Sequence, residues 1–209
     1  MKPRCEALVL GIGNVLWADE GFGVRAVEAL HAAFVFPPAV LLQDGGTLGL
    51  ALYDAISAAP RVLVFDAIDY RLPGGALRVL RDDEVPAWGR AKISPHQTGF
   101  NDVLALAQLN GCAPRTIVAI GVQPVLLDDF GGSLTDPVRA RLAEAVALGA
   151  NELAAWGFPG APRRTGEAFE PLNATSLTLE AYESGRPSSA DACRIGDPRV
   201  LADFLRDEN

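Results

Sequence analysis

The stretch RVLVFD at residues 61–66 says most about the fold, because an unbroken apolar run ends there in a carboxylate. Short apolar runs without polar alternation are typical of strands that are covered on both faces, as in a parallel sheet. Asp66 follows the run directly, and a carboxylate in that position has to be paired or solvated in a cleft. The stretch therefore predicts a central parallel strand with a polar group at its carboxyl end.

Hydrophobic patterns on either side of this stretch predict an alternation of strands and helices. Further strands are expected at residues 7–12, 40–42, 76–80 and 116–122. Helices are expected at residues 19–34, 48–58, 99–110 and 136–156. Asp19 and Asp136 are the predicted N-caps of the first and last helix. Strands that alternate with helices in this way predict an α/β layer fold with a mostly parallel sheet.

The chain of 209 residues is expected to contain one α/β domain at residues 1–157, followed by an extension at residues 158–209. The extension is rich in Pro, Gly, Ser and Arg and lacks the apolar residues for a core of its own, so it is predicted to be poorly packed or dependent on a partner. Three cysteines, Cys5, Cys112 and Cys193, lie far apart and form no Cys-x-x-Cys pair, which favours free, structural thiols.

Charge and hydropathy exclude several classes of partner. The net charge of −8 disfavours binding to nucleic acids and anionic membranes, because both reward basic surfaces. No run of about 18 apolar residues predicts a transmembrane helix. A glycine-rich turn follows the charged N-terminus too soon for a signal peptide, so a cytoplasmic location is expected.

Three polar segments are expected to meet at the carboxyl edge of the sheet, where open α/β sheets bind their ligands. Two of them follow the first and third strands, and the other precedes the helix at residues 99–110. Each offers one group that can bind a metal or move a proton, namely Glu20 or Asp19, Asp66, and His96. Two carboxylates and an imidazole suit borderline divalent metals such as nickel or zinc.

Each of these residues also has a structural explanation. Asp19 is better explained as a helix cap than as a ligand, and Glu20 can complement the helix dipole in the first turn. Asp69 is interpreted as a surface loop residue. His31 is interpreted as a surface residue near the end of the first helix. Asp66 and His96 are harder to explain by structure alone.

Other catalytic motifs are broken or absent in the sequence. Gly11-x-Gly13 follows a strand as in a dinucleotide-binding loop, but Leu16 stands where the third glycine would be. The sequence contains no phosphate-binding loop with Gly-Lys-Ser/Thr, no Gly-x-Ser-x-Gly nucleophile elbow and no His-Glu-x-x-His zinc helix.

A family resemblance is carried by motifs spread over residues 7–124. They are LVLGIGNVL at 8–16 with DEGFGVR at 19–25, DGGT at 44–47, Asp66-Ala67, RDDEVP at 81–86 and KISPHQ at 92–97. In this order they resemble the nickel–iron hydrogenase maturation endopeptidases, which are grouped with the aspartic-type peptidases. The resemblance implies a three-layer fold in which a twisted, mostly parallel five-stranded sheet is flanked by helices on both faces.

The resemblance also implies an activity and a site. The expected reaction is removal of a short C-terminal peptide from the nickel-loaded large-subunit precursor of nickel–iron hydrogenase. Glu20, Asp66 and His96 match the positions that contact the metal, and Asp44 matches a position near the cleft that can help to select the substrate. The nickel is expected to be supplied mainly by the substrate, with no organic cofactor. The extension can recruit accessory maturation proteins.

The chemical roles stay open at this point. The metal can polarise the scissile carbonyl or lower the pKa of a water molecule, and a carboxylate, with Asp66 the preferred candidate, can act as the general base. Two other classes of function compete with a peptidase. One is a non-catalytic chaperone of the immature large subunit, and the other is a nucleotide-binding enzyme that uses Gly11-Ile12-Gly13.

Overall fold

The fold is built around one five-stranded sheet in the strand order β3-β1-β4-β6-β5. A computed structural model describes residues 5–85, 95–164 and 166–186, without the side chains of residues 95–98. Strands β3 and β4 each pair with β1 in parallel, and β6 pairs with β4 in parallel, whereas β5 is antiparallel to β6. The strands are β1 (Ala7–Ile12), β3 (Val40–Gly46), β4 (Arg61–Ala67), β5 (Leu77–Arg81) and β6 (Thr116–Val122).

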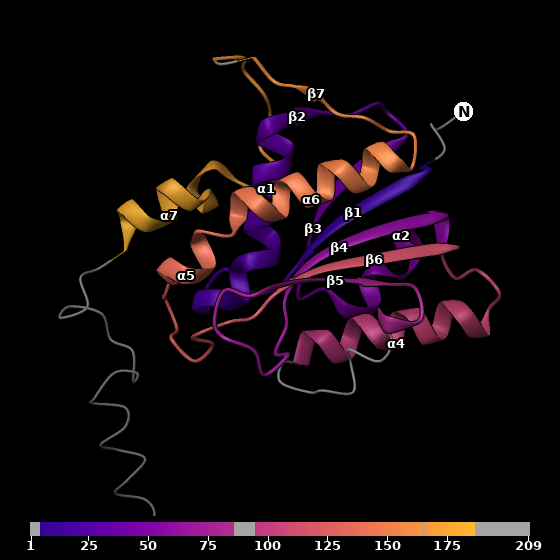
Figure 1. Ribbon diagram of the computed structural model, residues 1–209, viewed down its shortest axis with the longest axis horizontal. Helices are drawn as coiled ribbons and strands as arrows, with labels where there is room; N and C mark the ends of the chain where they lie inside the picture. Colours follow the sequence, from indigo (N-terminus) through magenta and orange to yellow (C-terminus); the bar gives the residue numbers. More distant parts are fainter. Residues whose placement is uncertain (1–4, 86–94, 165, 187–209) are drawn as a thin grey trace, which may run out of the picture.

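Helices cover both faces of the sheet and form two separate apolar layers (Figure 1). Val9, Leu63 and Phe65 face α1 (Phe22–Ala33) and α6 (Leu142–Ala155). Leu10 and Val64, one position along, face the opposite layer of η2 (Gly49–Leu52), α2 (Tyr53–Ala58) and α4 (Pro95–Leu109). Since apolar residues on both faces of β1 and β4 are buried, the continuous apolar runs of the sequence are explained. The predicted three-layer α/β fold is confirmed.

Several helix boundaries differ from those that the sequence predicts. Helix α4 begins at Pro95 instead of residue 99, because proline is well tolerated in the first turn of a helix. The expected helix at residues 136–156 is divided into α5 (Asp136–Arg139) and α6, because the amide of Arg141 closes a tighter turn on the carbonyl of Val138. Thr135, and not Asp136, is the N-cap residue of α5.

The described residues of the extension, 158–164 and 166–186, lie on the face formed by α1 and α6. Strand β7 (Ala161–Pro162) pairs with β2 (Phe34–Val35), and the extension continues through η3 (Thr175–Leu177) and α7 (Leu179–Gly185). Phe158 and Leu172 pack against the core, although no described residue of the extension is fully buried. Cys193 lies outside the described residues. The division of the chain at residue 157 stays a prediction.

Two further observations concern the whole described part of the chain. Cys5 and Cys112 have free thiols, as the sequence predicts. None of the helices in the described ranges is long and apolar enough to span a membrane.

Gly23 fixes the position of α1 over the sheet. A Cβ atom on Gly23 would lie 2.2 Å from the carbonyl oxygens of both Ile12 and Phe65, and 2.8 Å from the amide nitrogen of Ile12. The first turn of α1 therefore lies directly on the last residues of β1 and β4. Only glycine permits this approach, and the turn that precedes α1 is thereby held at the carboxyl edge of the sheet.

Gly23→Ala is expected to lower the free energy of unfolding by at least about 2 kcal/mol, because the atoms in the way are backbone atoms that cannot move aside. A thermal unfolding curve measures the change. Gly185→Ala is the matched control, since nothing lies within 4 Å of a Cβ atom at Gly185. Equal melting temperatures for the two variants would contradict this account of the packing.

Candidate active site

The turn between β1 and α1 brings Glu20 to the carboxyl edge of the sheet. It contains the short helix η1 (Ala18–Gly21). Gly13 has a φ of 130°, and a Cβ atom there would lie 1.8 Å from the carbonyl oxygen of Glu20. The backbone of η1 therefore folds back onto the end of β1, which only glycine at position 13 allows. Residues of η1 also contact β4, the strand that carries Asp66.

Asp66 is fully buried at the end of β4. Its Oδ1 accepts a hydrogen bond of 2.7 Å from the amide of Ala67. Asp66 lies opposite Gly121 of β6, and the alternation along β4 places it on the face of Val62 and Val64, which is the face covered by α2 and α4. Glu20 and Asp66 thus occupy neighbouring elements at one edge of the sheet.

His96 lies in the first turn of α4, although a loop was predicted there. One turn later, a Cβ atom on Gly99 would lie 3.1 Å from the Cα atom of Gly49 in η2, which follows β3. The amino end of α4 is therefore at the same edge of the sheet as the ends of β1 and β4 (Figure 1). The side chain of His96 is outside the described part of the structure.

Among the side chains that the structure describes, no three from His, Cys, Asp or Glu form a group that could hold a metal ion. The elements that carry Glu20, Asp66 and His96 share one edge of the sheet. Their joint contact with a metal stays a prediction.

The environment of Glu20 is partly shielded from solvent. Burial raises the pKa of the Glu20 carboxyl above its ordinary value. Desolvation makes the charged form of a carboxylate costly, and a neighbouring cation offsets that cost. Glu20 and Asp66 together therefore favour a positively charged ligand at this edge.

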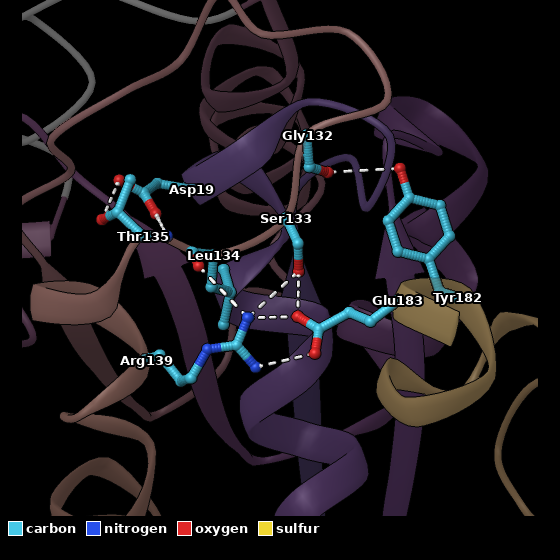
Figure 2. A network of polar contacts seen from close by, with 8 residues as sticks. All are labelled: Asp19, Gly132, Ser133, Leu134, Thr135, Arg139, Tyr182 and Glu183. Carbon is cyan, nitrogen blue, oxygen red and sulfur yellow. Dashed lines mark hydrogen bonds and ion pairs between the residues drawn. The ribbon is translucent and has the colours of Figure 1, made fainter. Parts of the chain in front are cut away.

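Asp19 is not the helix cap that the sequence predicts. It lies inside η1, whose N-cap residue is Trp17, and it is fully buried. Its Oδ2 accepts hydrogen bonds from the amides of Val125 (2.8 Å) and Leu126 (3.0 Å) and from the hydroxyl of Thr135 (3.0 Å). Its Oδ1 accepts a bond of 2.7 Å from the amide of Thr135 (Figure 2). Asp19 therefore joins three segments and is not available as a ligand.

Asp44 has a local role in the structure. Its Oδ1 accepts a hydrogen bond of 2.7 Å from the amide of Gly46, which has a positive φ of 42°. The carboxylate thereby stabilises the turn at the end of β3, at the same edge as the other candidates. A contribution of Asp44 to substrate selection stays a prediction.

Gln123 positions the loop after β4, a role that no sequence motif indicates. Its buried Oε1 accepts bonds from the amides of Tyr70 (2.7 Å) and Leu72 (3.1 Å). Its Nε2 donates to Oδ1 of Asp69 at 2.9 Å. The pKa of Asp69 is lowered, first by the hydrogen bond from the Arg71 amide and then by the one from Gln123. Asp69 therefore stabilises the loop, beyond the surface role that was predicted.

Tyr70 is a second residue that sequence reasoning missed. Its hydroxyl would lie 2.5 Å from a Cβ atom on Gly121, the residue opposite Asp66. The hydroxyl oxygen is buried and has no hydrogen-bond partner within the described residues. Burial, followed by the charge of Asp66, raises the pKa of Tyr70, so the hydroxyl remains a hydrogen-bond donor. Native structures rarely bury such a donor without a purpose.

Several known proteins are similar to this chain in sequence. A family model described as hydrogenase maturation protease matches residues 24–152. The hydrogenase expression/formation protein HupD of Thiocapsa roseopersicina is 52% identical over 203 residues, which cover 96% of this chain and 92% of HupD. The hydrogenase 2 maturation protease of Escherichia coli is 39% identical over 157 residues, covering 75% of this chain and 95% of the relative.

Solved structures show the same fold. The hydrogenase maturating endopeptidase HybD of E. coli superposes with a TM-score of 0.73 at 38% identity, over 76% of this chain and 98% of HybD. The [NiFe] hydrogenase maturation protease HybD of Thermococcus kodakarensis superposes with a TM-score of 0.58 at 28% identity, over 71% of this chain and 99% of that protein.

Asp19→Asn is expected to lower the free energy of unfolding by about 2–4 kcal/mol. The NH2 group of asparagine takes the place of one carboxylate oxygen of Asp19. Because both oxygens accept hydrogen bonds from backbone amides, the NH2 group then faces a second donor and a hydrogen bond is lost. Chemical denaturation measures the loss. Asp128→Asn is the matched control, because Asp128 is exposed on the segment that Asp19 holds. If both variants unfolded at the wild-type denaturant concentration, Asp19 would not be the structural centre described above.

Proposed function

Because the chain belongs to the hydrogenase maturation protease family, we propose that it removes a short C-terminal peptide from the nickel-loaded large-subunit precursor of nickel–iron hydrogenase. The observation that carries the proposal is the fully buried Asp66 at the end of β4, with Glu20 in the adjoining turn. The protein is a peptidase of hydrogenase maturation, and the large-subunit precursor is the substrate that this family implies. The proposed reaction takes place in the cytoplasm.

The nickel belongs to the substrate in this proposal. Glu20, Asp66 and His96 complete its coordination when the precursor docks, since two carboxylates and an imidazole suit a borderline divalent metal. Full burial of Asp66 and partial burial of Glu20 favour a cation at their edge of the sheet. Bound nickel would supply Lewis acidity at the scissile peptide. Three protein ligands are few for tight binding, so the enzyme alone is expected to hold little metal.

The requirement for a loaded precursor follows from this arrangement. Without nickel, the precursor lacks the atom that the three side chains recognise, and it is expected to remain uncleaved. The test is to mix the purified protein with nickel-loaded or nickel-free precursor and to read the mass of the large subunit. Loss of a C-terminal peptide in the loaded sample alone is expected. Binding without any loss of mass would instead favour a chaperone.

Substitutions at the three positions are expected to abolish processing without unfolding the protein. The variants are Glu20→Gln, Asp66→Asn and His96→Ala, and each is expected to reduce the rate by at least about a hundredfold, as for loss of a catalytic group. Melting temperature measures folding, and mass spectrometry of the large subunit measures processing.

Each variant has a matched control, which is the same type of substitution at a position away from the site. Glu180→Gln changes an exposed residue of α7, and Asp54→Asn changes an exposed residue of α2. His31→Ala changes the other histidine, whose Nε2 lies 2.9 Å from the carbonyl oxygen of Glu170. Wild-type processing by the three site variants would show that the site has been assigned to the wrong residues.

Tyr70 is proposed to donate a hydrogen bond to the bound precursor beside Asp66. Tyr70→Phe is expected to keep or raise the melting temperature, because it removes a buried donor without a partner within the described residues. The turnover number for processing is expected to fall about tenfold, in line with one lost transition-state donor. Tyr53→Phe is the control, since that hydroxyl contacts Asn110 and Cys112. Unchanged turnover in Tyr70→Phe would remove this role.

A further inference from the structure

Large apolar side chains are exposed next to the candidate site. Four of them are more than a third exposed, at 39% for Leu16, 54% for Val125, 36% for Leu126 and 50% for Phe130. Trp17 completes the group, because its ring meets that of Phe130 edge-on with centroids 5.3 Å apart. Together these five residues form the apolar rim.

We propose that the apolar rim binds the large-subunit precursor beside its scissile peptide, through a segment of the precursor that is apolar and flanked by basic residues. This inference rests on the proposed function. It names the surface by which the substrate is held, which is separate from the groups that contact the metal.

Backbone contacts join the two halves of the apolar rim into one surface. The amide of Gly131 donates a hydrogen bond of 2.7 Å to the carbonyl of Leu16, and Trp17 forms a β-bridge with Phe130. The amide of Asp19 donates a bond of 3.1 Å to the carbonyl of Leu126. Residues 16–17 and residues 125–130 are therefore neighbours in space, although more than 100 positions separate them in the chain.

Hydrogen bonds to the buried Asp19 hold the backbone of the apolar rim in place. The carboxylate of Asp19 binds the amides of Val125 and Leu126, two of the residues that expose their side chains. A surface that is already ordered loses little conformational entropy when a partner binds, which favours affinity. Preorganisation of this kind distinguishes a binding surface from apolar side chains scattered on mobile loops.

Helix α7 of the extension supports the same segment (Figure 2). The hydroxyl of Ser133 donates a bond of 2.6 Å to Glu183, and the hydroxyl of Tyr182 donates to the carbonyl of Gly132 at 3.2 Å. Arg139 also pairs with Glu183. The hydrogen bonds from Arg139 and Ser133 lower the pKa of Glu183, with the Arg139 bond the larger cause. The extension thus helps to fix the loop that carries Phe130.

The position of the rim identifies its occupant. Trp17 adjoins η1, which contains Glu20, so a chain bound in the site passes over or beside the rim. An endopeptidase has to hold its substrate on either side of the bond that it breaks, and contiguous exposed apolar residues mark such interaction surfaces. Asp128 is exposed on the same loop, and the protein has a net charge of −8, which favours basic residues at the edge of the partner segment.

The test measures binding and cleavage separately. The affinity of Phe130→Ser for purified nickel-loaded precursor is expected to fall at least tenfold, with a matching rise in KM and a turnover number within twofold of wild type. Val125→Ser is a second variant in case Phe130→Ser is unstable. Leu109→Ser is the control, because Leu109 is 85% exposed at the far end of α4.

Wild-type affinity in both rim variants would overturn the docking proposal, whatever the cleavage assay shows. Weakened binding by the rim variants, with no cleavage by the wild type, would support the rim and contradict the proposed function. A second outcome would also overturn the docking proposal. If the wild type were a dimer in sedimentation and Phe130→Ser a monomer with unchanged affinity for the precursor, the rim would be an interface between two copies of this chain.

Discussion

The buried carboxylate of Asp19 is the contact on which the working edge of this protein depends. Its two oxygens accept four hydrogen bonds from Val125, Leu126 and Thr135, while its backbone belongs to η1. The turn after β1 and the segment after β6 are thereby held together. Glu20 lies one residue further along this turn. Val125 and Leu126, which donate two of these bonds, belong to the apolar rim. One side chain therefore links the turn that carries Glu20, the apolar rim, and the segment at residues 132–139 against which the extension packs.

Glycine performs the complementary task of bringing backbones together. Gly11 would place a Cβ atom 2.3 Å from the carbonyl oxygen of Gly23, and Gly13 would place one 1.8 Å from that of Glu20. In a dinucleotide-binding loop, glycines leave space for a pyrophosphate. Here that space is occupied by backbone atoms of Gly23 and Glu20. The partial Gly-x-Gly pattern is therefore explained by packing of η1 and α1 on β1.

Much of the fold could be predicted because apolar runs report burial on both faces of a strand. Strand β6 has the predicted ends, and the Asp66 strand lies at the centre of the sheet. The helix after residue 135 was predicted as one element, because its pattern of apolar residues does not show the tight turn at Ala140 and Arg141. Asp19 was misinterpreted for a similar reason. Aspartate before a helix has the local pattern of a cap, whereas its partners here lie more than 100 residues away.

The candidate site, too, could be predicted only in part from local sequence patterns. Glu20, Asp66 and His96 were predicted as site residues from family motifs and from the rule that ligands bind at the carboxyl edge of a parallel sheet. Gln123 and Tyr70 follow no motif, because their importance depends on a loop geometry that exists only after folding. The burial of the Tyr70 hydroxyl over Gly121 is a property of two strands and a loop together. Gln123 becomes visible through its hydrogen bonds to the loop, and Tyr70 through a buried hydroxyl that has no partner within the described residues.

The central claim is that side chains of this protein bind nickel that the substrate carries, and the nickel itself reports on it most directly. X-ray absorption at the nickel edge can be recorded for the loaded precursor alone and for its complex with the protein, frozen before cleavage. The account predicts that the complex gains oxygen and nitrogen ligands at about 2.0–2.2 Å, the range for carboxylate and imidazole bonds to borderline metals. An unchanged nickel spectrum in a complex that goes on to cleave would contradict it.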